Sequence, residues 1–332
     1  MRKRYLFLAP LLAVAACLTA CAPTAPTEEE LFLYRENADQ DSYSVIGSTE
    51  PLNGNIELPA EHNGLPVTGV GQAAFMQQAE LTALEIPLSI EDIQTSAFAS
   101  CEKLGAVVFH EGLERIGESA FRGCYSLEQI ALPASLRTIG ARTFWGCTGM
   151  KDVTIGENVH SIGERAFYEC ESLENVMISD IDAWCEISFA NAYSNPLYFA
   201  ENLVLDGEVV TTLSVDVPVA FSAFRGYGKL EHATFGAGVT RIGGSAFYDC
   251  DGMVSIVMGK ETAQIGSYAF EGCTALESVF YQGTEAEWNM IEISEHNEPL
   301  TEAAIYYYME EQPSAAGNYW HYEEGQPVVW NV

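Results

Sequence analysis

Basic residues are scarce in this chain. Its 332 residues include 15 lysines and arginines against 47 aspartates and glutamates, which gives a formal net charge of -32 at pH 7. A chain this acidic is repelled by the phosphates of nucleic acids and by anionic lipid headgroups. We therefore expect no nucleic-acid partner. Basic partners or divalent cations would suit the charge, and an acidic surface that only keeps the protein soluble is the alternative.

The sequence also lacks the short motifs that carry familiar catalytic and cofactor chemistry. No H-E-x-x-H, G-x-S-x-G or G-x-x-x-x-G-K motif occurs. Asn37, Asp39 and Asp41 begin like a calcium-binding loop, but the glycine and the terminal glutamate of such a loop are missing. The histidines are scattered over the chain, at His62, His110, His160, His232, His296 and His321. We expect no catalysis, no cofactor and no metal site.

A fixed spacing of 23 residues organises most of the chain. It relates the cysteines Cys101, Cys124, Cys147 and Cys170, and again Cys250 and Cys273. It also relates the phenylalanines Phe75, Phe98, Phe121, Phe144 and Phe167, and again Phe224, Phe247 and Phe270. A period of this length indicates one small unit stacked many times into a solenoid, which favours a binding surface over a catalytic cleft. The phenylalanines should form the core of each coil, with the terminal copies contributing less stability.

Each repeat closes on an I-x-L pattern, as in Ile130-Ala131-Leu132. This alternation directs two apolar side chains inward and the residue between them outward, and stacked repeats should form a parallel sheet. The glycine that follows the first isoleucine of the repeat, as in Ile116-Gly117, should allow a sharp bend. The outward positions are candidate partner-binding residues: Glu85, Val108, Ala131, Thr154, Met177, Thr234, Val257 and Phe280.

The repeat unit I-G-x-x-A-F-x-x-C-x-x-L-x-x-I-x-L-P, read from Ile116 to Pro133, resembles the Treponema pallidum-type, or BspA-like, leucine-rich repeats of bacterial surface proteins. The resemblance covers roughly residues 43–281, and Ile56 to Val70 is similar to the usual first coil of that family. It implies a mostly β repeat solenoid with a parallel concave sheet and irregular convex walls. It also implies export, attachment to the cell surface and binding of host or neighbouring-cell macromolecules.

The repeat is interrupted once, because 57 residues separate Phe167 from Phe224. We expect repeats over 43–178 and 218–283, an enlarged coil with Trp184 over 179–217, and a variant coil with Trp288 over 284–309. Each tryptophan should lie on a short helical turn that is followed by a strand. The tryptophans either fill the core of a longer coil or form a ligand platform.

The N-terminus has the layout of a secretory signal over residues 1–20, with a basic start and an apolar stretch from Tyr5 to Ala16. Leu18-Thr19-Ala20-Cys21 resembles the lipobox of bacterial lipoproteins, which implies lipid attachment at Cys21. Val14-Ala15-Ala16-Cys17 fits the same loose pattern, and we prefer Cys21 because it leaves a longer apolar stretch and is followed at once by a polar tether. An ordinary cleaved signal and an uncleaved anchor are the alternatives. Residues 21–42 should be an acidic, proline-containing linker.

The cysteine positions and the C-terminal tail each allow more than one interpretation. Equivalent cysteines on neighbouring coils point the same way, which suits disulfide geometry poorly, and no C-x-x-C pair suggests a metal site. We expect them to be buried and reduced. Residues 310–332 should form a linker and an aromatic hairpin. This hairpin either caps the last coil or, through Trp320 and Trp330, stacks on carbohydrate.

These patterns and the resemblance together predict a cell-surface lipoprotein that binds a protein or glycoprotein on a host or neighbouring cell. The outward positions of the I-x-L strands are the expected site, catalysis is not expected, and the membrane is reached through the lipid anchor only. One alternative is a structural envelope protein without a specific ligand. Another is a glycan-binding or glycan-processing accessory.

Overall fold

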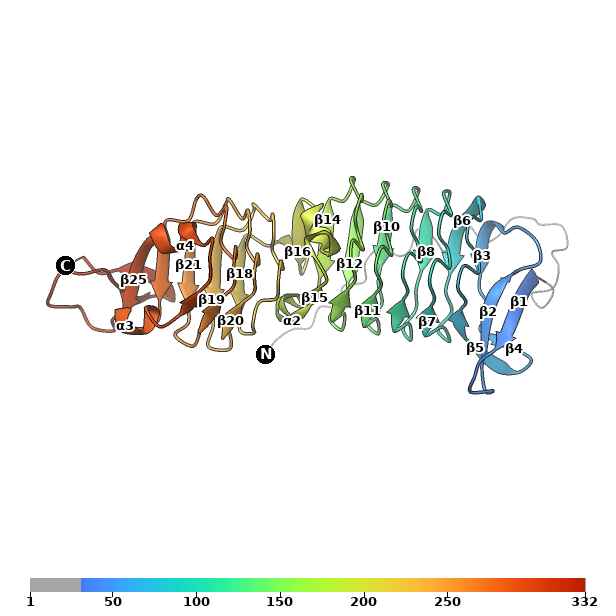
Figure 1. Ribbon diagram of the computed structural model, residues 1–332, viewed down its shortest axis with the longest axis horizontal. Helices are drawn as coiled ribbons and strands as arrows, with labels where there is room; N and C mark the ends of the chain where they lie inside the picture. Colours follow the sequence, from blue (N-terminus) through green and yellow to red (C-terminus); the bar gives the residue numbers. More distant parts are fainter. Residues whose placement is uncertain (1–30, 332) are drawn as a thin grey trace.

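The computed structural model describes residues 31–331 and shows an elongated, mostly β solenoid of about 12 turns (Figure 1). The predicted fold class, a mostly β repeat solenoid with a spacing of about 23 residues, is confirmed. Residues 1–20 with the predicted signal, and Cys21 with the predicted lipid, lie outside the described residues. No helix within residues 31–331 is long and apolar enough to cross a membrane.

Most coils contribute one strand to each of two sides of the solenoid. After the first three, the strands at the Ile-Gly end of the repeat have only two residues each. They pair in the order β1 (Phe32–Glu36), β2 (Tyr43–Ser48), β5 (Leu65–Val70), β7 (Asp92–Ile93), β9 (Arg115–Ile116), β11 (Thr138–Ile139), β13 (Ser161–Ile162) and β15 (Ser188–Phe189), with β4 (Glu61–His62) beside β5. Further along, β20 (Arg241–Ile242), β22 (Gln264–Ile265) and β24 (Glu292–Ile293) form a separate sheet. The sequence predicted only the I-x-L sheet, because strands of two residues show no alternation.

The I-x-L strands form three sheets along the other side of the coils. The first contains β3 (Asn53–Glu57), β6 (Glu80–Glu85) and β8 (Ala106–Val108). The second contains β10 (Gln129–Ala131), β12 (Asp152–Ile155), β14 (Asn175–Ile178), β16 (Asn202–Leu205) and β17 (Glu208–Val209). The third contains β18 (Thr212–Val215), β19 (His232–Phe235), β21 (Ser255–Met258), β23 (Ser278–Tyr281), β25 (Ala304–Tyr308), β26 (Tyr319–Glu323) and β27 (Gln326–Val329).

The repeated phenylalanines are buried and stack ring on ring through the core. From Phe75 to Phe167 the centroids of neighbouring rings lie 5.2 to 5.8 Å apart. A second stack from Phe224 to Phe270 has spacings of 5.3 Å. Each interior ring is therefore covered by its equivalents on both sides, which explains why the sequence repeats this residue.

The repeated cysteines are free and buried, in agreement with the expectation. Each donates its thiol hydrogen to the carbonyl of the phenylalanine 26 residues earlier, as Cys147 does to Phe121 at 3.3 Å. Burial raises the pKa of Cys101 to about 11 and that of Cys170 to about 12. Tyr227 takes the equivalent position after the enlarged coil, where its hydroxyl donates to the carbonyl of Val210 at 2.8 Å. The position therefore couples stacked coils through a hydrogen bond.

The glycine after the first isoleucine of the repeat serves close stacking, and the expected bend lies elsewhere. A Cβ on Gly163 would stand 2.4 Å from the backbone nitrogen of Ala141 in the preceding coil, and one on Gly140 would stand 2.6 Å from that of Glu118. The left-handed backbone occurs two residues later, at Arg142 and Arg165, with φ of 55° and 54°. The prediction of a bend at the glycine itself is wrong.

The segment 21–42, predicted as a linker, contains a strand. β1 spans Phe32–Glu36 and pairs antiparallel with β2. Phe32 is buried, and its ring meets that of Phe75 edge to face at 6.0 Å. The linker prediction is wrong from Phe32 onward, since this strand closes the N-terminal end of the core. The carboxylate of Asp39 accepts hydrogen bonds from the Ser42 hydroxyl and the Asp41 amide, which closes a turn.

Both variant coils carry their tryptophan on a helix. These helices are α2 (Ile181–Glu186) and α3 (Glu285–Trp288), and the strands β16 and β25 follow them. Short helices at Ala192–Ser194, Pro196–Tyr198 and α4 (Glu298–Glu302) complete the coils. Trp184 and Trp288 are buried, and the indole N–H of Trp184 donates to the carbonyl of Ala223 at 3.0 Å. The tryptophans therefore pack the enlarged coils and are not ligand platforms.

Candidate functional site

The outward residues of the I-x-L strands lie in register, and we call them the outward row. Ala131, Thr154 and Met177 are successive partners on β10, β12 and β14. The register also pairs Glu85 with Val108 on β6 and β8, and places Thr234, Val257 and Phe280 on β19, β21 and β23. Three positions that the repeat pattern did not reveal join the same rows, namely Val204, Ser214 and Tyr306.

The C-terminal end of the outward row is covered by the tail. Val257 and Phe280 are only 6% and 8% exposed, because they form a small cluster with Trp320 of the hairpin. The expectation that these two residues face a partner is therefore wrong while the hairpin is docked. Glu85, Val108, Ala131, Thr154, Met177 and Thr234 remain half-buried or exposed.

The C-terminal hairpin, formed by β26 and β27, extends the I-x-L sheet through parallel pairing of β26 with β25. Trp320 is fully buried and cannot stack on carbohydrate. Trp330 is half-buried; its indole N–H donates to the carbonyl of Met309 at 2.9 Å, and its ring stacks on His321 at 3.7 Å. These contacts support the capping interpretation of the tail.

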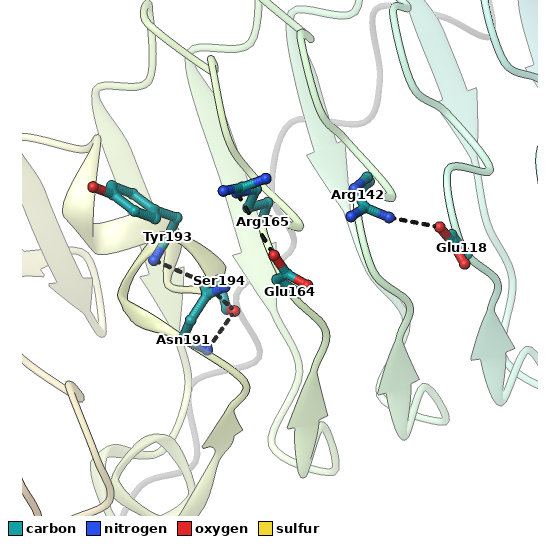
Figure 2. A network of polar contacts seen from close by, with 7 residues as sticks. All are labelled: Glu118, Arg142, Glu164, Arg165, Asn191, Tyr193 and Ser194. Atoms are coloured by element: carbon teal, nitrogen blue, oxygen red, sulfur yellow. Dashed lines mark hydrogen bonds and ion pairs between the residues drawn. The ribbon is translucent and has the colours of Figure 1, made fainter.

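A second candidate surface, which sequence reasoning missed, lies on the segments that connect β9, β11 and β13 to the next I-x-L strand. We call these segments the turn wall. The residue after each buried repeat phenylalanine faces outward there, and in three successive coils it is Arg122, Trp145 and Tyr168. Arg142 and Arg165 lie on neighbouring coils of this wall (Figure 2), near the rings of Trp145 and Tyr168 respectively. The identity of this one variable position in successive repeats is the sequence signal that could have revealed the surface.

The buried repeat thiols within residues 31–331 offer no nucleophile. Burial raises the pKa of Cys273 to about 12 and holds those of Cys124, Cys147 and Cys250 well above the usual value, so the thiolate does not form near neutral pH. Stacked thiols also hydrogen-bond to backbone carbonyls, so they are not arranged to converge on a metal.

One group of residues within 31–331 has its potential ligand atoms close together. Glu271, His296 and Glu298 offer atoms within 4.8 Å of one another. His296 and Glu298 are exposed, and Glu271 is half-buried. The His296 ring stacks on Tyr268 at 4.2 Å. Exposed acidic groups gather in this way without an ion, and no buried polar partner points into the group, so we assign no metal to it.

A groove with a volume of about 410 Å³ lies beside the docked hairpin. It is lined by Ala237, Lys260, Glu261, Gln282, Tyr308 and Tyr322. The Gln282 amide donates to the hydroxyl of Tyr322 at 2.7 Å, which ties the hairpin to the coil. The lining contains no pairing of a nucleophile with a base, so the groove gives no support to catalysis.

Comparisons with known proteins agree with the repeat pattern. The family model described as "BspA type Leucine rich repeat region" matches residues 68–195 and 218–295, in six copies. No curated protein matches the chain.

Among solved structures, the chain is similar to the T. pallidum leucine-rich repeat protein TpLRR, with 24% identity, 76% of this chain and 91% of that chain covered, and a TM-score of 0.46. It is also similar to the pneumococcal vaccine antigen PcpA, with 16% identity, 83% and 85% covered, and a TM-score of 0.42. A leucine-rich cell surface protein from Faecalibacterium prausnitzii shares 19% identity, with 82% and 98% covered and a TM-score of 0.39.

Proposed function

The chain belongs to the BspA type leucine rich repeat family, and from that premise we propose that it is an exported binding protein of the bacterial cell surface, held to a membrane by lipid on Cys21. Members of this family are typically exposed on the bacterial surface. The basic and apolar N-terminus and the lipobox-like run before Cys21 support export and anchoring. One acyl chain gives only marginal membrane binding, whereas two give a stable anchor.

The partner is a protein or glycoprotein of a host or neighbouring cell, and binding involves no catalytic step. The observation that carries this proposal is the open part of the outward row, from Glu85 through Val108, Ala131 and Thr154 to Met177. Most of these side chains are apolar or small, on a protein that is otherwise strongly acidic. A contiguous stripe of this kind is typical of an interaction surface.

The mature protein, solubilised in detergent, should be screened against matrix proteins and mucins. Once a partner binds, a variant with Val108→Glu and Met177→Glu should weaken binding at least about tenfold, since it places two charges on the stripe without entering the core. The matched control is Leu88→Glu with Met290→Glu, which adds the same charge at exposed apolar residues elsewhere. Equal binding by both variants would reject the outward row, and no binding to any surface component would favour a structural envelope protein.

Anchoring is tested separately. Cys21→Ala should move the protein from the membrane fraction to the soluble or secreted fraction, and the wild-type N-terminal peptide should carry the mass of its acyl chains. Cys17→Ala is the matched control and should leave both results unchanged. An unlipidated N-terminal peptide in the wild type would overturn the anchor.

A further inference from the structure

Exposed aromatic side chains form a continuous band on the turn wall. The ring of Trp145 meets that of Tyr168 edge to face at 5.5 Å, and Tyr168 meets Tyr193 in the same way at 5.5 Å. Tyr193 meets Tyr198 at 5.1 Å. Tyr193 and Tyr198 are 39% and 40% exposed, and Trp145 and Tyr168 are half-buried. So many partly solvated rings in one place are unusual for a surface without a ligand.

Three arginines lie against this band. The guanidinium carbons of Arg122 and Arg142 stand 5.0 and 5.9 Å from the centre of the Trp145 ring, and that of Arg165 stands 5.8 Å from the centre of the Tyr168 ring. At such distances the ring attracts the guanidinium electrostatically and keeps it near the aromatic surface.

Among the described residues, carboxylates engage only two of the three arginines. Arg142 donates to Glu118 at 2.9 Å, while Arg165 lies 3.7 Å from Glu164 (Figure 2). Within residues 31–331 no ion pair involves Arg122. Ion pairs between exposed groups contribute little free energy, so these guanidinium groups can exchange partners when a ligand arrives.

The patch interleaves aromatic rings with polar groups of both signs. Its carboxylates are those of Glu118, Glu164 and Glu169, and the last accepts from the indole N–H of Trp145 at 2.9 Å. Three arginines thus meet three carboxylates, which makes the patch locally neutral in a chain of net charge -32. An anionic ligand is repelled less here than elsewhere on the protein.

This composition fits a sugar better than a protein. Aromatic residues and arginine are common in protein interfaces, but glutamate is depleted there, and this patch holds three glutamates. A sugar ring offers apolar C–H faces that pack on aromatic rings, and hydroxyls that both donate and accept hydrogen bonds. Guanidinium donors and carboxylate acceptors beside the rings meet both needs. The Arg122 guanidinium, free of a carboxylate partner among residues 31–331, can bind a sugar carboxylate through two parallel N–H groups.

We propose that the aromatic–arginine patch, made of Arg122, Arg142, Trp145, Arg165, Tyr168, Tyr193 and Tyr198, binds an acidic glycan whose sugars carry carboxylates. The patch lies on the turn wall and not on the outward row, so the proposal does not depend on the partner of that row. A sulfated glycan that carries more than one charge per sugar is a poor ligand, because the remaining surface repels it.

The test measures binding of the full mature protein to oligogalacturonate and to sialyllactose by calorimetry, with lactose as the neutral probe and a glutamate-rich peptide as the acidic non-sugar probe. We expect at least one carboxylate-bearing sugar to bind, more weakly as salt rises, and to bind better than lactose. Binding of neither acidic sugar, or equal binding of lactose, would overturn the proposal. Tighter binding of the acidic peptide would point to a protein ligand and would overturn it as well.

Matched variants locate the site. Trp145→Ala and Arg122→Gln should each raise the Kd of the bound sugar about tenfold or more, the size expected when a central aromatic or arginine contact is lost. The controls are Tyr322→Ala, an exposed aromatic on the hairpin, and Arg137→Gln, an exposed arginine before β11. Trp145→Phe keeps a ring and should retain most of the affinity, which separates stacking from a folding defect. Unchanged affinity in Trp145→Ala would reject the patch, whatever the outcome for Val108→Glu with Met177→Glu.

Discussion

Trp320 lies against Phe280, with ring centroids 5.5 Å apart and ring planes inclined at 62°. Its indole N–H donates to the carbonyl of Tyr281 at 2.8 Å. Phe280 points away from the main core, so the hairpin builds a second small apolar cluster on the outer side of the sheet. Trp320 therefore caps the last coil and also covers Val257 and Phe280, the C-terminal residues of the outward row.

Trp320→Ala should undock the hairpin and uncover Val257 and Phe280, while the solenoid stays folded. Losing a fully buried tryptophan costs about 3–5 kcal/mol, which exceeds what a two-stranded hairpin can supply alone. Limited proteolysis should then cut between Tyr308 and Tyr319, and amide exchange in β27 should accelerate. Trp330→Ala is the control and should have the smaller effect, because that side chain is only half-buried. Full protection of β27 in Trp320→Ala would contradict this role.

Phe144→Ala should cost about 3–5 kcal/mol of unfolding free energy, because the ring is buried between Phe121 and Phe167. The repeat pattern predicts a smaller loss at Phe75, in the first regular coil. The structure changes that expectation, since Phe32 covers the outer side of Phe75. Chemical denaturation of both variants should give similar losses, and Phe75→Ala should cost less in a chain that already carries Phe32→Ala, where only Phe98 still covers the ring. A small loss at Phe144 would contradict the stacked core.

Much of this architecture could be predicted because stacking in register makes position in the repeat equivalent to position in space. The period placed the phenylalanine stack, the buried cysteines and the in-register row at Ala131, Thr154 and Met177. Features without a period stayed hidden. β1 pairs with a segment outside the regular repeats, and the hairpin reaches Phe280 from 40 residues away.

The aromatic–arginine patch shows a different limit. Within a single repeat, the residue after the core phenylalanine is simply a variable position. Charged and aromatic groups come to lie side by side only because neighbouring coils carry different residues at this position, namely Arg122, Trp145 and Tyr168. The rings of Tyr193 and Tyr198 come from the enlarged coil, whose path over the turn wall no repeat pattern specifies. The repeat pattern therefore predicts which residues form the core, whereas the composition of this surface patch depends on contacts between coils.

Gly163→Ala should destabilise the solenoid by about 1–3 kcal/mol, as expected when a methyl group is forced against a packed backbone. The new Cβ would meet the Ala141 backbone nitrogen at 2.4 Å, and a backbone atom in a stacked coil cannot rotate away. Gly105→Ala is the matched control, because its Cβ would meet no atom closer than 3.5 Å. Thermal or urea unfolding should show a clearly lower stability for Gly163→Ala than for Gly105→Ala. Equal stability would show that adjacent coils can move apart at this position.

The buried thiols should make the protein sensitive to alkali. Burial raises the folded-state pKa of Cys101 from about 9 to about 11, and those of Cys170 and Cys273 to about 12. In the unfolded chain the thiols ionise once the pH exceeds their ordinary pKa. This ionisation lowers the free energy of the unfolded state, whereas the buried thiols of the folded state stay protonated. Stability from these groups is therefore complete below about pH 9 and falls as pH rises toward 11, by about 1.4 kcal/mol per pH unit for each thiol.

Urea unfolding at pH 7, 9, 10 and 10.5 should measure how steeply the free energy of unfolding falls with pH. Cys147→Ala lowers stability at every pH because it removes a packed side chain, but its slope above pH 9 should be shallower than that of the wild type by one thiol's share. Tyrosines and lysines also titrate in this range and are common to both proteins, so the difference between the slopes isolates the thiol. Identical slopes in wild type and Cys147→Ala would mean that the thiol at this position ionises as readily in the folded coil as in the unfolded chain.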